Sequence, residues 1–163
     1  MYFSCKTSLR IICMTNVKQA LYDYCWQYVE QRRARLQEEI HLIQASANEE
    51  TKSSAGDKYE TGRSMAQLEI ERNSQQLNEA NKLQQVLKGI TPDHVSDVVI
   101  PGSVVHTSHG VFYIAISIGV FTLEEKQFLI ISSDSPIGKL LMGRKVGDTI
   151  TWNKMTYTIQ IIE

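Results

Sequence analysis

Several patterns that would indicate an independent enzyme or a membrane protein are missing from the sequence. No stretch approaches the ~20 consecutive apolar residues that a membrane-spanning helix needs, so no membrane partner is expected. The phosphate-binding patterns G-x-x-x-x-G-K-S/T and G-x-G-x-x-G are absent, and so is the G-x-S-x-G turn that carries a hydrolase nucleophile. We therefore expect neither a small-molecule substrate nor a catalytic site that works without a partner.

An excess of one charge and a cysteine framework are also missing. The chain has 17 Lys and Arg residues against 18 Asp and Glu residues, so bulk attraction to nucleic acid is not predicted and any basic effect has to be local. The three cysteines, Cys5, Cys13 and Cys25, are odd in number, and their spacing fits no C-x-x-C metal site. Because disulfides favour oxidising compartments, we interpret them as reduced thiols without structural importance in a cytoplasmic protein.

The first residues lack the features of a secretory signal. The apolar stretch LRIIC is short and interrupted by Arg10, whereas a signal core has about 7–15 apolar residues. Met14 stands directly before TNVKQAL, where Thr15 or Asn16 can act as the N-cap of a helix. We therefore expect residues 1–14 to be a disordered or artefactual extension and the first helix to begin near Asn16.

Proline is absent from residues 15–88, and good helix formers dominate this half of the chain. Apolar residues recur there at gaps of three and four, which indicates helices over about 16–47 and 57–87. The first stripe, with a break at Arg32, contains Leu21, Cys25, Tyr28, Leu36, Ile40 and Ile43. The second, interrupted at Asn73 and Gln84, contains Ala66, Ile70, Leu77, Ala80 and Leu87. Polar residues within a seven-residue rhythm are typical of coiled coils that fix their register at some loss of stability.

The segment between the two stripes, ANEETKSSAGD, is rich in turn and capping residues. Two helices joined by such a segment most simply fold back as an antiparallel pair. Residues 15–90 are therefore predicted to form a helical hairpin with its tip near residues 47–60. Each helix of about 30 residues would be roughly 45 Å long.

After residue 90 the composition changes to β-branched and aromatic residues, which favour strands. SPIGKLLMG interrupts them with a serine N-cap, a proline at the first helical position and a glycine stop. Residues 91–163 are therefore predicted to form a small antiparallel sheet with one short helix, which gives the whole chain the α+β class. The predicted strands lie in GSVVHT, GVFYIAISIG, KQFLIIS, DTITW and TYTIQII.

The stretch SPIGKLLMGRKVGDTI is the most distinctive in the sequence. By itself it predicts only a capped helix, a basic turn and the start of a strand. Its residue pattern resembles the C-terminal signature of the GreA/GreB family of bacterial transcript-cleavage factors. This resemblance implies an FKBP-like domain that follows an antiparallel coiled coil in the chain. The match is carried by Ser135, Pro136, Ile137, Gly138, Gly143, Lys145, Gly147 and Asp148.

The resemblance also implies a function. In that family the coiled coil enters the secondary channel of RNA polymerase and stimulates cleavage of backtracked RNA, so RNA polymerase and the nascent RNA and DNA of the elongation complex are the expected partners. Two tip acids after a glycine act there, and GDKYE supplies Gly56, Asp57 and Glu60. Asp57 and Glu60 are then candidate catalytic residues that share Mg²⁺ with the polymerase, which implies an accessory factor rather than an enzyme. Docking to the polymerase would involve Ser135, Pro136, Ile137, Gly138, Gly147 and Asp148.

The chemistry of the two acids agrees with this role. Residues three apart on a helix face the same side, and carboxylates are the hard oxygen ligands that Mg²⁺ binds. Two carboxylates are too few to hold the ion alone, but they could complete a two-metal site for phosphodiester hydrolysis. The simpler alternative is that acids at the start of a helix complement its dipole.

The stretch EQRRARLQ concentrates positive charge at Arg32, Arg33 and Arg35. We interpret these residues as a basic patch that contacts RNA or the polymerase, because phosphate attraction of this kind is local and salt-sensitive. A solvated helix face is the alternative. The same two interpretations apply to a smaller cluster formed by Lys139, Arg144 and Lys145.

Other functions stay open at this point. Tyr59 stands before Glu60 where the family commonly has a lysine, so the protein could be a non-cleaving channel regulator or another protein-binding module on the same scaffold. An FKBP-like domain also raises prolyl isomerisation, although a fold does not carry a function. His106 and His109 lie three apart, but cysteine or carboxylate residues at zinc-site spacing do not accompany them.

Overall fold

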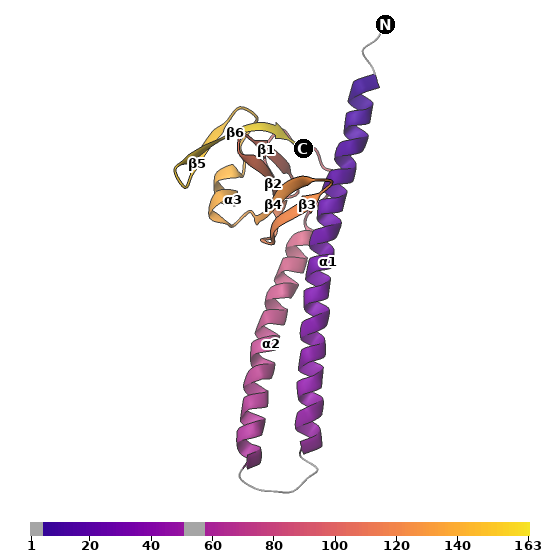
Figure 1. The fold of residues 1–163 in the computed structure, drawn as a ribbon, viewed down its shortest axis with the longest axis vertical. Coiled ribbons are helices and arrows are strands. Elements are labelled where there is room, and N and C mark those ends of the chain that lie inside the picture. Colours follow the sequence, from indigo (N-terminus) through magenta and orange to yellow (C-terminus); the bar gives the residue numbers. More distant parts are fainter. Residues whose placement is uncertain (1–4, 51–57) are drawn as a thin grey trace. The chain divides into compact units, whose positions relative to one another are not determined.

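The computed structural model describes residues 5–50 and 58–163, without the side chains of residues 5–16, 49–50 and 58–60. Two long helices precede a six-stranded sheet with one short helix (Figure 1), which confirms the predicted α+β class. In the described ranges, no helix combines the length and the apolar character that crossing a membrane requires. The elements are α1 (Cys5–Glu50), α2 (Lys58–Lys88), β1 (Val104–Thr107), β2 (Gly110–Ala115), β3 (Gly119–Leu123), β4 (Lys126–Ser132), α3 (Pro136–Leu141), β5 (Thr149–Trp152) and β6 (Met155–Ile162).

The first helix begins earlier than the sequence analysis predicts. Because α1 starts at Cys5, Thr15 and Asn16 lie inside it and neither caps its start. The preceding residues of α1 include no proline or glycine that would end a helix. The predicted start near Asn16 is therefore wrong, whereas the expectation that residues 1–14 are an artefactual extension stays a prediction.

The chain divides into two compact units. The hairpin unit is Gln27–Gln85, and the sheet unit contains the part of α1 up to Trp26 and the chain from Val86 onward. Within the hairpin unit Glu30 contacts Gln84, and Arg33 contacts Asn81. Later positions on α1 thus meet earlier positions on α2, and the helices are antiparallel as predicted.

A narrow seam joins the two helices of the hairpin unit. Val29, Leu36 and Ala80 are fully buried along it, whereas Tyr28 of the predicted stripe is only half-buried. Asn73 is 8% exposed, so a polar side chain occupies the seam where the predicted stripe is interrupted. The seven-residue rhythm therefore marks real contact positions, including polar ones.

The sheet unit contains one mixed sheet with the strand order β3-β4-β2-β1-β6-β5. All neighbours are antiparallel except β2 and β4, which run parallel, so the sheet is mainly antiparallel as predicted and departs from the prediction at this one pair. The predicted strand over residues 110–119 is in fact β2, which ends at Ala115, followed by β3, which begins at Gly119. Both β2 and β4 have runs of buried residues, which is typical of strands covered on both faces.

Helices cover both faces of the sheet. On one face, Ile137 and Leu141 of α3 complete a core with the buried side chains of the strands. On the other, Phe121 of β3 stacks on Tyr24 of α1 with ring centroids 3.9 Å apart. Cys25 is fully buried beside this contact, and burial raises the pKa of its thiol to about 12. The interpretation of the cysteines as structurally unimportant is therefore wrong for Cys25, which fills the core as a small apolar side chain.

Candidate functional site

The two candidate acids lie at the segment between the long helices. α1 ends at Glu50 and α2 begins at Lys58, so Gly56 and Asp57 are outside the described residues. Glu60 lies in the first turn of α2, but its side chain is outside the description. The catalytic role of the acids and their shared Mg²⁺ therefore stay predictions. Within the described ranges, no group of three or more His, Cys, Asp or Glu residues could hold a metal ion.

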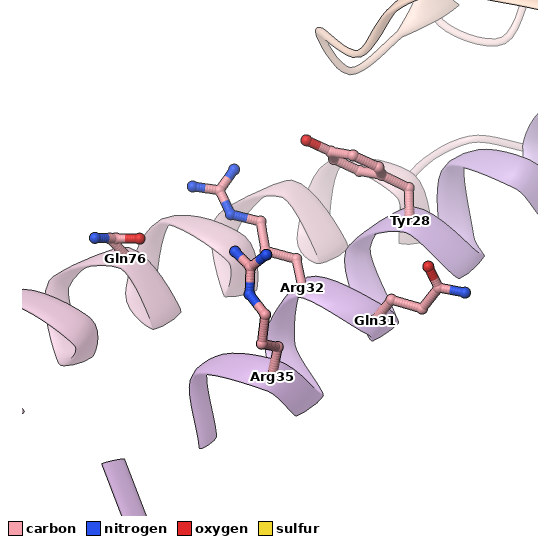
Figure 2. A pocket seen from close by; sticks show the side chains of 5 residues that line it. All are labelled: Tyr28, Gln31, Arg32, Arg35 and Gln76. Carbon is pink, nitrogen blue, oxygen red and sulfur yellow. The ribbon is translucent and has the colours of Figure 1, made fainter. Parts of the chain in front are cut away.

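The structure separates the three arginines of the predicted basic patch. Arg32 and Arg35 line a shallow surface concavity of about 410 Å³ together with Tyr28 and Gln31 of α1 and Gln76 of α2 (Figure 2). Arg35 forms an ion pair with Glu39 of its own helix at 3.6 Å, and such an exposed pair contributes little. No ion pair links Arg32 to another residue in the described part of the chain. This face of α1 therefore presents two guanidinium groups beside an aromatic ring.

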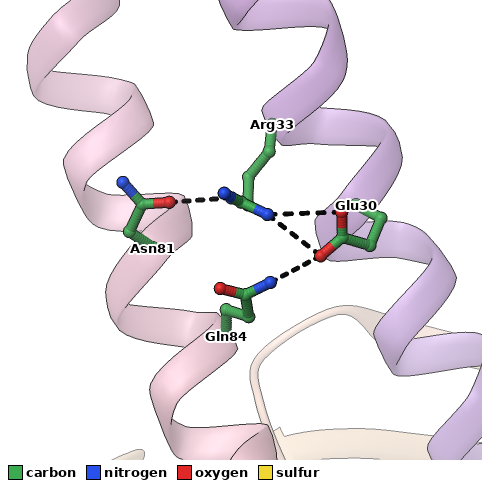
Figure 3. Close-up of polar contacts among 4 residues, drawn as sticks. All are labelled: Glu30, Arg33, Asn81 and Gln84. Carbon is green, nitrogen blue, oxygen red and sulfur yellow. Dashed lines mark hydrogen bonds and ion pairs between the residues drawn. The ribbon is translucent and has the colours of Figure 1, made fainter.

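Arg33 lies instead among polar side chains between α1 and α2 (Figure 3). Its Nε donates to Asn81 Oδ1 at 2.7 Å, and its Nη1 donates to both carboxylate oxygens of Glu30 at 3.0 and 3.2 Å. Gln84 Nε2 donates to Glu30 Oε1 at 2.6 Å. The guanidinium of Arg33 is thus occupied within the hairpin unit.

The residue types at the start of the stretch that resembles the GreA/GreB signature, residues 135–150, are explained by the local structure of α3. Ser135 Oγ accepts from Gly138 N at 3.1 Å and donates to the Ser132 carbonyl at 2.6 Å, which caps the helix as predicted. Pro136 occupies the first turn. A Cβ at position 138 would collide with the Ser132 carbonyl oxygen, so only glycine fits there. Ile137 and Gly138 are buried, which leaves Ser135 and Pro136 as the residues of this group that a partner can contact.

The end of the stretch forms the turn into β5. Gly143 and Gly147 have φ values of 73° and 92°, a region that favours glycine. Asp148 Oδ2 accepts from Lys145 N at 2.9 Å and closes the turn between them. Gly147 N donates to the Ile159 carbonyl at 2.8 Å and ties the turn to β6. The predicted docking role of Gly147 and Asp148 stays a prediction, because their structural roles already account for their residue types.

The second basic cluster lies on the surface of the sheet unit. Lys139, Arg144 and Lys145 are all exposed, and Arg144 Nε donates to the Leu140 carbonyl at 3.3 Å. The exposed side chain of Val146 follows them in the same turn. The cluster is therefore available to a partner, and a solvated surface remains the alternative interpretation.

A polar group that the sequence did not reveal joins α1 to the rest of the sheet unit. Lys18 is only 5% exposed, and its Nζ donates to the His94 carbonyl at 2.8 Å. Burial lowers the pKa of Lys18, while nearby Glu163 and Asp93 oppose the shift. His106 Nε2 lies 3.1 Å from Glu163 Oε1, so a carboxylate contact occupies this histidine. No pattern near Lys18 could identify partners that come so much later in the chain.

The second histidine of the predicted pair is also accounted for. His109 packs edge-on against Tyr157 with ring centroids 5.4 Å apart. Among the described residues, the two histidines belong to no set of possible metal ligands. Their contacts explain both side chains without a metal.

Comparison with known proteins supports the resemblance in the same stretch. A family model described as "Transcription elongation factor, GreA/GreB, C-term" matches residues 122–163, from within β3 to the last residue. No curated protein and no solved structure matches the chain, so the FKBP-like description stays a prediction. The C-terminal part of this chain is therefore similar to the C-terminal domain of the GreA/GreB transcription elongation factors.

Proposed function

We propose that this protein is a transcription elongation factor that binds RNA polymerase in its secondary channel and stimulates cleavage of backtracked RNA. The observation that carries the proposal is the joining, in one chain, of a GreA/GreB C-terminal match to a two-helix hairpin. α1 has 46 residues and α2 has 31, so α2 alone is about 46 Å long. The polymerase supplies the catalytic machinery in this proposal, and the protein is an accessory factor.

Asp57 and Glu60 are proposed to act at the polymerase active site. Their carboxylates fit Mg²⁺ by the chemistry of the donor atoms, although two ligands need further oxygen atoms from the polymerase. A second Mg²⁺ in such a site supplies activation of a water molecule and stabilisation of the leaving oxygen. Glu60 lies in the first turn of α2, and the start of a helix also favours negative charge.

The face that carries Tyr28, Arg32 and Arg35 is proposed to contact the nascent RNA. Guanidinium groups attract phosphates in a salt-sensitive way, and an aromatic ring beside them can stack on an unpaired base. Arg33 is engaged with Glu30 and Asn81, which makes it a weaker candidate for this contact. An acidic surface of the polymerase is the alternative partner of the same face.

The test is a cleavage assay on halted elongation complexes with the cognate polymerase. Wild type should release short 3′ RNA fragments, and Asp57→Ala and Glu60→Ala should each lose most of this activity while still binding. Glu69→Ala is the matched control, because it removes an exposed acid from the same helix. Binding without fragments in wild type would reject cleavage and leave a non-cleaving regulator. Absence of binding would reject both.

A further inference from the structure

The geometry points to a register lock in the hairpin unit: Glu30, Arg33, Asn81 and Gln84, here called the polar bridge, set the axial alignment of α1 and α2. The two helices are linked twice, through Arg33 with Asn81 at 2.7 Å and through Glu30 with Gln84 at 2.6 Å. The two links share Glu30 and Arg33, which contact each other at 3.0 Å. Figure 3 shows the four side chains converging between the helices.

The apolar seam alone specifies the alignment weakly. Along α2 of the hairpin unit the buried residues Asn73 and Ala80 are seven positions apart and stand at equivalent positions of the repeat. The small side chain of Ala80 and the polar side chain of Asn73 fill little space, so a displaced helix would lose few well-packed contacts. Apolar contact is also non-directional and tolerates displacement.

The polar bridge does not tolerate displacement. A slip by one helical turn moves α2 by about 5.4 Å along α1, which is farther than any hydrogen bond reaches. Asn81 would leave Arg33, and Gln84 would leave Glu30, at the same time. Arg33 would keep Glu30 on its own helix, but its Nε would lose its acceptor Asn81 while the side chain is only 23% exposed. Polar contacts of this kind are a well-attested way to fix the register of a coiled coil.

The consequence for function rests on the function proposed above. Glu60 lies on the same continuous helix as Asn81 and Gln84. A slip of α2 would therefore move Glu60 by the same distance relative to α1. The polar bridge is a positioning device and touches no reacting atom.

The register can be measured in the free protein by pulsed electron paramagnetic resonance between spin labels at positions 45 and 79. Ala45 on α1 and Glu79 on α2 are both exposed, and Cys5, Cys13 and Cys25 would be replaced by alanine to direct labelling. Wild type should give one narrow distance distribution. Arg33→Met should add a population displaced by an axial slip of about 5.4 Å.

Three further variants make the result decisive. Asn81→Leu should also broaden the distribution, and it serves if Arg33→Met unfolds the hairpin. Asn81→Asp keeps an acceptor for Arg33, so it should retain the narrow distribution of wild type that Asn81→Leu loses. Arg72→Met is the control, because it removes an exposed arginine of α2. Unchanged distributions in both Arg33→Met and Asn81→Leu would overturn the lock, even if both variants lowered stability.

The outcome is independent of the polymerase, so the two proposals can fail separately. In the cleavage assay Asn81→Leu should lower the maximal rate severalfold and leave the half-saturating concentration of the factor unchanged. A broadened distribution with no cleavage by wild type would keep the lock and reject the proposed function. Cleavage by wild type together with an unchanged distance distribution in Arg33→Met and Asn81→Leu would keep the proposed function and reject the lock.

Discussion

The sheet unit and the hairpin unit are stabilised in different ways. In the sheet unit, α3 and the strands enclose a continuous apolar cluster that extends from Val99 to Ile159. In the hairpin unit, two helices leave no interior, and Val29, Leu36 and Ala80 form a single buried line. A side chain in the cluster has neighbours on all sides, whereas one in the line has water nearby. The comparison indicates that apolar packing determines the stability of the sheet unit, whereas the alignment of the two helices in the hairpin unit depends more on which polar side chains meet.

Truncating one buried leucine in each unit should give the largest contrast. Leu141→Ala should lower the free energy of unfolding of the sheet unit by about 4 kcal/mol, because the enclosed cavity cannot close. Leu36→Ala should lower that of the hairpin unit by about 2 kcal/mol, because two helices can move together. Urea unfolding followed by tryptophan fluorescence reports the sheet unit, which contains Trp26 and Trp152. Circular dichroism reports the helices, and equal losses would contradict the comparison.

The same glycine substitution should have opposite signs in the two units. Gly138→Ala places a Cβ against the Ser132 carbonyl and should destabilise by about 1–3 kcal/mol through overpacking. Gly62 lies on the exposed surface of α2, so Gly62→Ala should stabilise this helix by about 0.5–1 kcal/mol. Thermal unfolding of both variants checks this. Destabilisation by Gly62→Ala would show that its backbone is not free to accept alanine.

Two tyrosine hydroxyls within the sheet unit allow a smaller comparison. The Tyr113 hydroxyl is buried without a hydrogen-bond partner in the described structure, and burial raises its pKa. Tyr113→Phe should therefore stabilise by about 1 kcal/mol, since it removes an unsatisfied polar group. The Tyr22 hydroxyl donates to the Leu87 carbonyl at 3.2 Å, so Tyr22→Phe should destabilise by about 0.5–1.5 kcal/mol. Equal changes in urea midpoint would reject this contrast.

The smallest expected effect concerns the buried Lys18 at alkaline pH. Burial lowers the pKa of Lys18 below 10.5, so the unfolded chain binds more protons between the two pKa values. The contribution of Lys18 to the free energy of unfolding should therefore rise as pH increases through the folded pKa toward 10.5. Lys18→Met should lack this rise, and exposed Lys82→Met should keep it. The difference from wild type isolates Lys18, because Cys25 and Tyr113 have raised pKa values and act in the opposite direction. Parallel profiles would contradict the prediction.

Much of the local structure follows from the sequence alone. The absence of proline and the two apolar stripes predict the long helices, because helix formation depends on residues three and four apart. The N-cap Ser135, the first-turn Pro136 and the glycine stop at Gly143 predict α3, because helix ends also depend on residues close in the sequence. The family resemblance in this stretch could also be recognised from the sequence, because the helix cap, the close approach at Gly138 and the turn at Gly147 each require particular residue types.

Only the tertiary structure decided which distant residues meet. The parallel pairing of β2 with β4 could not be predicted, because β3 intervenes in the sequence and forms the edge strand. The burial of Lys18 against the His94 carbonyl and the turning of Arg33 toward Asn81 likewise join residues far apart in the chain. Local preferences act within a few residues, whereas these contacts form only when whole elements pack and each polar group must find a partner.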